Sequence, residues 1–212
     1  MLERFTWFKQ SAYRWDGDGL TLYIDPWEAE GGPADLILIT HAHGDHYQPE
    51  EIERLRKDST KIVAPHDVAR ELSGDVTAVA PGDSVEVSGV KIQAVPAYNI
   101  VEERLDKHPK ANNWVGYLLT LGGHTYYHAG DTDHLPELES LRTNVAFLPI
   151  GSFFTMDPDE AAGLARAMAP DLAVPMHYGF VVGSPSFADQ FARAAAPVPV
   201  QTLDPVRPFE RQ

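Results

Sequence analysis

The run His41-Ala42-His43-Gly44-Asp45-His46 begins one residue after the run Leu36-Ile37-Leu38-Ile39. Together the two segments indicate a strand that leads into a group of possible metal ligands. The continuous aliphatic run is typical of a strand that is covered on both faces. The first two histidines are two positions apart, so their side chains point the same way in extended backbone. The glycine permits a sharp turn that returns the last aspartate and histidine to the same pocket. The pattern predicts a metal site at a strand end.

The chemistry of this site is restricted because the chain contains no cysteine. Any metal must be held by imidazole and carboxylate, which suit Zn²⁺, Mn²⁺ or Fe. A single histidine is usually a surface residue or a hydrogen-bonded core residue, but three of them within six positions at a strand end favour a metal site. Asp131 and His177 each follow a predicted strand. Alone, Asp131 would indicate a turn and His177 a histidine near the surface. Beside the first cluster, both become better candidates for metal ligands.

These motifs and their order resemble the metallo-β-lactamase superfamily. The superfamily-level likeness rests on the first run, on Gly130-Asp131-Thr132 and on His177. The segments 127–132, 148–151, 154–156 and 175–178 are similar to those of its bacterial and archaeal branch of small metal-dependent hydrolases, which includes the ascorbate-phosphate lactonase. The resemblance spans nearly the whole chain. It implies an α+β fold (αββα), a four-layer sandwich of two mixed β-sheets with helices on the outer faces and the metals at one edge between the sheets.

The resemblance also implies a ligand set, carried over position by position. It assigns His41 and His43 to a first metal, Asp45, His46 and His177 to a second, and Asp131 to a bridge between them. One feature departs from the family, which usually supplies a third histidine to the first metal. The corresponding stretch, residues 95–99, contains none. Water, Asn99 or His108 reaching in from a later loop could fill that position.

The remaining pattern predicts one domain over residues 1–212 with strands and helices in both halves. Strands are expected in residues 5–15, 20–25, 36–39, 62–64, 85–87, 90–95, 114–121, 124–129, 145–148 and 172–175, and helices in 49–57, 66–72, 158–168 and 186–194. Residues 100–113 are polar and lack periodicity, which indicates a long loop. Loops of this length in compact domains are often functional.

Charge and composition limit the partners. The formal net charge of −14 argues against nucleic acid as a partner, because phosphates require a basic surface. The N-terminus lacks the features of a signal peptide, and no apolar run approaches the roughly 20 residues of a membrane span. We therefore expect a cytoplasmic protein that acts on a small molecule away from membranes. Oligomeric state is not readable from the sequence, although acidic enzymes of this size often form symmetric homo-oligomers.

The function expected from these residues is metal-dependent hydrolysis of an ester, lactone or phosphoester bond. One or two divalent ions, with zinc expected first and manganese or iron as alternatives, would supply a metal-bound hydroxide that Asp45 helps to orient. Neither a Gly-x-Ser-x-Gly nucleophile motif nor a phosphate-binding loop is present. Two alternatives remain open: a mononuclear iron oxidoreductase on the same fold, and a non-catalytic metal-binding module, which the incomplete first site favours.

Overall fold

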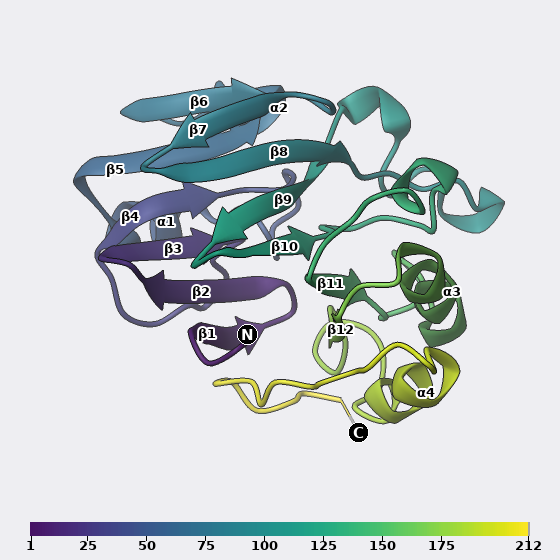
Figure 1. The fold of residues 1–212 in the computed structure, drawn as a ribbon. Helices are drawn as coiled ribbons and strands as arrows, with labels where there is room; N and C mark the ends of the chain where they lie inside the picture. The colour runs from purple at the N-terminus through teal and green to yellow at the C-terminus, as the bar shows by residue number, and fades with distance from the viewer. Residues whose placement is uncertain (212) are drawn as a thin grey trace.

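Two six-stranded β-sheets pack against each other in the computed structural model, which describes residues 1–211 (Figure 1). The first sheet has the order β1 (Phe5–Lys9), β2 (Ala12–Gly17), β3 (Leu20–Ile24), β4 (Ala34–Leu38), β5 (Arg56–Pro65) and β6 (Asp75–Val79). The second has the order β12 (Leu172–Met176), β11 (Val145–Pro149), β10 (His124–His128), β9 (Val115–Leu121), β8 (Val90–Pro96) and β7 (Ser84–Val87). Each half of the chain therefore builds one sheet.

Both sheets are mixed. In the first, β1 to β3 pair antiparallel and β3 to β6 pair parallel. In the second, β7 to β10 pair antiparallel and β10 to β12 pair parallel. Parallel strands end at the same edge of a sheet, and in such sheets ligands bind beyond those carboxyl ends.

Helices cover the outer face of each sheet. The helix α1 (Pro49–Leu55) buries its apolar side chains in a cluster with the first sheet, and α2 (His66–Ala69) contacts β5 and β6. The helix α3 (Pro158–Met168) contacts β11 and α4 (Phe187–Ala194). A capping box formed by Asp157 and Glu160 begins α3. The predicted αββα sandwich is thus confirmed.

The strand before the histidine run is buried on both faces, as its continuous aliphatic sequence predicts. Leu36 and Leu38 belong to the cluster between the two sheets, whereas Ile37 and Ile39 belong to the cluster under α1. All four side chains are fully buried. A polar substitution on either face would therefore disturb the strand that delivers the histidines.

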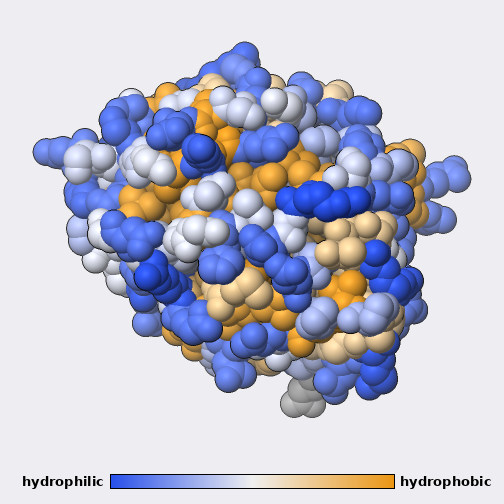
Figure 2. Space-filling model, in the orientation of Figure 1, coloured by the Kyte–Doolittle hydropathy of each residue, from blue (hydrophilic) through white to orange (hydrophobic). Residues whose placement is uncertain are grey.

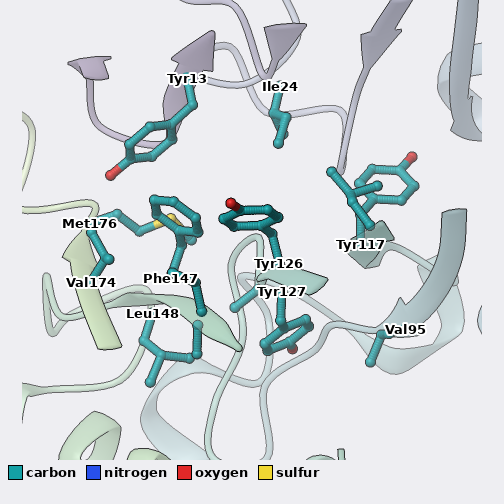
Figure 3. Packing of buried hydrophobic residues seen from close by; sticks show 14 of the residues in the cluster. Tyr13, Ile24, Val95, Tyr117, Tyr126, Tyr127, Phe147, Leu148, Val174 and Met176 are labelled. Carbon is teal, nitrogen blue, oxygen red and sulfur yellow. The ribbon is translucent and has the colours of Figure 1, made fainter. Parts of the chain in front are cut away.

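Aromatic side chains fill much of the space between the sheets (Figure 3). Tyr13 of the first sheet packs on Phe147 of the second, with ring centroids 4.9 Å apart, and Phe5 packs on Tyr126 at 5.0 Å. Tilted aromatic pairs at these distances stabilise a core beyond the area that they bury. This packing fixes the two sheets relative to each other, and so fixes the edge at which their strands end.

Several element boundaries differ from those that the sequence predicts. Residues 5–15 form two strands rather than one, because Gln10 takes a left-handed backbone conformation (φ 47°) that turns the chain. The helix expected over 49–57 ends at Leu55, since pairing with β4 draws Arg56 into β5. The helix expected over 66–72 ends at Ala69, and the edge strand β6 was not predicted.

Figure 2 shows hydrophilic side chains over most of one face, with small apolar patches among them. Within residues 1–211, no helix has the length and apolar character needed to cross a membrane.

Candidate metal centre

The predicted ligands converge at the edge where the strands of both sheets end. The histidine run leaves β4 of the first sheet, while Asp131 follows β10 and His177 follows β12 of the second. A fourth segment, the loop after β8, carries His108 to the same place. The structure therefore brings all six predicted ligands together with His108. The seven residues are His41, His43, Asp45, His46, His108, Asp131 and His177.

The first group of possible ligand atoms contains three imidazoles. His41, His43 and His108 place ring nitrogens within 4.8 Å of one another. Their ring centroids are 4.8 to 5.0 Å apart, and the ring of Trp114 lies 5.0 Å from His41 and 4.9 Å from His43. His108 thus occupies the position for which the sequence left water, Asn99 and His108 as alternatives.

The second group contains Asp45, His46 and His177, again with ligand atoms within 4.8 Å of one another. Asp131 lies between the groups. Its Oδ1 is 3.3 Å from His46 Nε2, and its Oδ2 is 3.0 Å from His177 Nε2 and 3.3 Å from His108 Nε2. A carboxylate in contact with both groups has the geometry required of a bridging ligand.

Three further side chains hold the imidazoles from behind. Asp25 Oδ2 lies 2.7 Å from His46 Nδ1, Thr40 Oγ1 lies 2.9 Å from His41 Nδ1, and Asn99 Oδ1 lies 2.9 Å from His108 Nδ1. A partner on Nδ1 fixes the tautomer and leaves the Nε2 lone pair free for a metal. Asn99, expected as an additional ligand, instead faces His108 with its oxygen.

Sequence reasoning missed Asp25 and Thr40. Both are fully buried, and Thr40 donates to Asp25 through its backbone N–H and its hydroxyl, at 2.7 and 2.6 Å. The sequence contained a weak signal for Asp25, which comes at the end of a predicted strand as Asp131 does.

Gln10 was also missed, and it reaches the second group from the turn between β1 and β2. Its Nε2 lies 3.3 Å from Asp45 Oδ2 and 3.1 Å from His177 Nε2, and its carbonyl oxygen accepts the backbone N–H of His177 at 3.0 Å. The side chain is completely buried, and its Oε1 has no hydrogen-bond partner within the described chain. The turn at Gln10, which the sequence did not predict, therefore places this side chain against Asp45 and His177.

Burial favours the neutral form of two imidazoles of the first group, His41 and His43. Removal from water lowers the pKa of His41, and neighbouring imidazoles lower it further despite the opposing carboxylate of Asp131. Burial and His108 likewise lower the pKa of His43. Neutral imidazoles are the form that binds metal ions.

In the second group, attraction between opposite charges shifts the pKa values of His177 and Asp45. Burial opposes a charge on His177, but Asp131 and Asp45 outweigh it and raise the pKa of that imidazole to about 9. Burial also opposes ionisation of Asp45, yet His46 and His177 outweigh it and lower the pKa of the carboxyl. Opposite charges at short range account for both shifts.

Unpaired polar atoms point into the centre. Within residues 1–211, the Nε2 atoms of His41, His46 and His108 and the Oδ1 of Asp131 are buried without a hydrogen-bond partner. Buried polar atoms almost always have a partner, since an unpaired one is costly. Divalent cations bound at the two groups would satisfy these atoms, and histidine with carboxylate is a donor set that such ions accept. The residues present therefore fit a metal centre.

A pocket of about 510 Å³ opens onto this centre. The residues from the centre that line it are His43, Asp45, Asp131 and His177, joined by Gly44. Trp27, Asp106, Lys107, Phe154 and Val181 complete its walls. The volume is that of a small-molecule site.

Comparison with known proteins gives a consistent result. Residues 4–177 match the model of the β-lactamase superfamily domain. A UPF0173 metal-dependent hydrolase of Methanopyrus kandleri is 32% identical over 98% of this chain and 100% of its own length. A crystal structure from Parabacteroides distasonis, described as that of a metal-dependent hydrolase, has a TM-score of 0.83 and 33% identity, covering 98% of this chain and 93% of the other.

A third similar protein is a metallo hydrolase from Ignicoccus hospitalis, with a TM-score of 0.78, 25% identity and coverage of 95% of this chain and 94% of that one. The family model covers most of the chain, and the Methanopyrus relative matches nearly all of it. The chain belongs to the UPF0173 metal-dependent hydrolase family within the metallo-β-lactamase superfamily.

Proposed function

We propose that this protein is a hydrolase that uses two divalent metal ions, zinc in the first instance, to cleave an ester, lactone or phosphoester bond in a small substrate. The observation that carries the proposal is the pair of three-residue ligand groups in contact with one carboxylate, Asp131. The names of the family members support metal-dependent hydrolysis in general.

In this proposal His41, His43 and His108 hold one ion, Asp45, His46 and His177 hold the other, and Asp131 contacts both. When bound, such ions lower the pKa of a water molecule toward neutrality and stabilise negative charge on a substrate oxygen. The protein contributes the rigid placement of the imidazoles, through Asp25 on His46, Thr40 on His41 and Asn99 on His108.

Asp45 is the acidic residue best placed to act on a substrate. Its side chain is 24% exposed and lines the pocket, whereas that of Asp131 is 3% exposed. The lowered pKa of Asp45 keeps the carboxylate ionised at neutral pH. It can therefore accept a hydrogen bond from an attacking water molecule and orient it toward the substrate.

The test begins with metal-depleted protein that is reloaded with zinc, manganese or iron. Metal content is measured by mass spectrometry, and activity is measured on a panel of esters, lactones and phosphodiesters. We expect two ions per chain and hydrolysis that Asp45→Ala abolishes. Protein that is fully loaded but hydrolyses nothing on the panel would contradict the proposal and favour a binding module. Oxygen consumption by the iron-loaded form, without hydrolysis, would favour an oxidoreductase.

A further inference from the structure

A second pocket, of about 830 Å³, lies beside the metal pocket. Phe154 and Val181 line both pockets, so the two adjoin. The second pocket, called here the apolar groove, is lined by Gly151, Ser152, Phe153, Phe154, Val181, Val182, Gly183, Ser184, Phe187 and Arg211. The apolar groove is therefore the neighbouring space that a molecule bound at the metal centre would reach by extending past Phe154.

The groove exposes large apolar side chains that a soluble protein normally buries. Phe153 is 68% exposed and Val181 is 37% exposed. The ring of Phe153 lies 4.7 Å from that of Phe154 in an edge-to-face arrangement, and Phe154 in turn forms a wall of the metal pocket. Contiguous exposed apolar surface usually marks a binding site.

The loop that carries these aromatic residues is held in an unfavourable backbone conformation. Ser152 and Phe153 have φ values of 62° and 41°, which non-glycine residues rarely adopt. The loop is tied to the metal centre, because Asn99, the partner of His108, also donates from Nδ2 to the carbonyl oxygen of Phe154 at 3.1 Å. The surrounding structure thus maintains an exposed aromatic ring next to the proposed ligands.

Apart from the proposed ligands and the ions they would hold, the described lining of the metal pocket offers a strongly anionic substrate no unpaired cationic side chain. Lys107 is the one lysine or arginine in that lining, and its Nζ is paired with Asp106 at 2.8 Å. In the apolar groove, Arg211 is the one charged residue within the described lining.

We propose that the apolar groove binds the hydrocarbon part of the substrate, so that the enzyme acts on esters or lactones that carry an acyl chain of several carbons rather than on sugar phosphates. The inference rests on the proposed hydrolytic function, because the metal centre would hold the scissile carbonyl. Removing a methylene from water into an apolar site strengthens binding by up to about fourfold. Affinity should therefore rise with chain length.

The first experiment measures kcat/KM of the zinc-loaded protein for 4-nitrophenyl acetate, butanoate, hexanoate and octanoate. We expect kcat/KM to rise roughly tenfold or more from butanoate to octanoate, and Phe153→Ala to remove most of that rise. Leu105→Ala is the matched control, because Leu105 is also exposed (49%) on a neighbouring loop but lines neither pocket. Equal rates for all chain lengths would overturn the inference.

A second experiment separates this inference from the proposed function. Calorimetric titration of the zinc-loaded protein with butanoate and octanoate measures binding without turnover. Tighter octanoate binding that Phe153→Ala abolishes, with no ester cleaved, would support the groove and contradict hydrolysis. Ester cleavage with equal affinity for both acids would support hydrolysis and contradict the groove. If Phe153→Ala instead converts a dimer to a monomer in sedimentation, the groove is a contact between copies of the chain and the inference is wrong.

Discussion

The side-chain oxygen of Asn99 accepts two hydrogen bonds from His108, one from the backbone N–H at 3.0 Å and one from ring Nδ1 at 2.9 Å. The orientation of this amide is fixed because its Nδ2 donates to the carboxylate of Asp133, which can only accept, at 2.8 Å. The proton of His108 therefore resides on Nδ1, and the Nε2 lone pair faces the centre. Asn99, which sequence analysis treated as a possible ligand, instead positions His108 of the first group.

The first prediction concerns this amide. In Asn99→Ala, His108 loses the partner that sets its tautomer, and we expect metal affinity of the first group to fall about 10- to 100-fold. Competition with a chelator of known affinity measures the change. Asn112→Ala, in the same loop but exposed, is the control and should leave affinity unchanged. Equal affinity of Asn99→Ala and the native protein would show that His108 needs no such support.

The second prediction concerns His108 itself. If this imidazole completes the first group, His108→Ala should lower the metal content of the protein from two ions to one, because His41 and His43 alone hold an ion weakly. Mass spectrometry of protein dialysed against a low zinc concentration measures the stoichiometry. His124→Ala, which removes an exposed histidine, should retain two ions. Two tightly bound ions in His108→Ala would remove His108 from the ligand set.

Strand ends were predictable from the sequence, and so were six residues at or near them that converge in the structure. The aliphatic run before His41 indicates a buried strand, and both its faces are buried in the structure. His108 could not be assigned, because it lies in a loop without periodicity and its position depends on hydrogen bonds to Asn99.

The supporting network was harder to predict because its partners are distant in sequence. Asp133, which is buried, accepts from the backbone N–H of Ile100 and Val101 and pairs with Arg104 at 2.5 Å, and so holds the loop that carries His108. No local pattern indicates such pairing, which exists only once the sheets are packed.

The third prediction concerns Asp25, whose buried carboxylate joins two strands and the centre. Asp25→Ala leaves the backbone N–H of Thr40 and the Nδ1 of His46 without their partner. An unsatisfied buried donor costs about 1–3 kcal/mol, so we expect the free energy of unfolding of metal-free protein to fall by at least that amount. Urea denaturation measures it. Asp58→Ala, which removes an exposed carboxylate of β5, should change stability by less than about 0.5 kcal/mol. A similar small change in Asp25→Ala would contradict this account.

The fourth prediction concerns Gln10, whose amide lies against Asp45 and His177. Gln10→Ala keeps the carbonyl oxygen that accepts the His177 N–H but removes the side chain that restrains both proposed ligands. We expect metal affinity of the second group to fall about tenfold, in line with other residues that orient ligands, while the first group keeps its ion. Titration of cobalt into metal-depleted protein, followed by the visible spectrum, separates the two binding steps. Only the step assigned to the second group should shift to higher cobalt concentration. Gln93→Ala, on the exposed face of β8, is the control and should leave both steps in place. If Gln10→Ala weakened both steps equally, its side chain would act on the packing of the whole edge and not on Asp45 and His177.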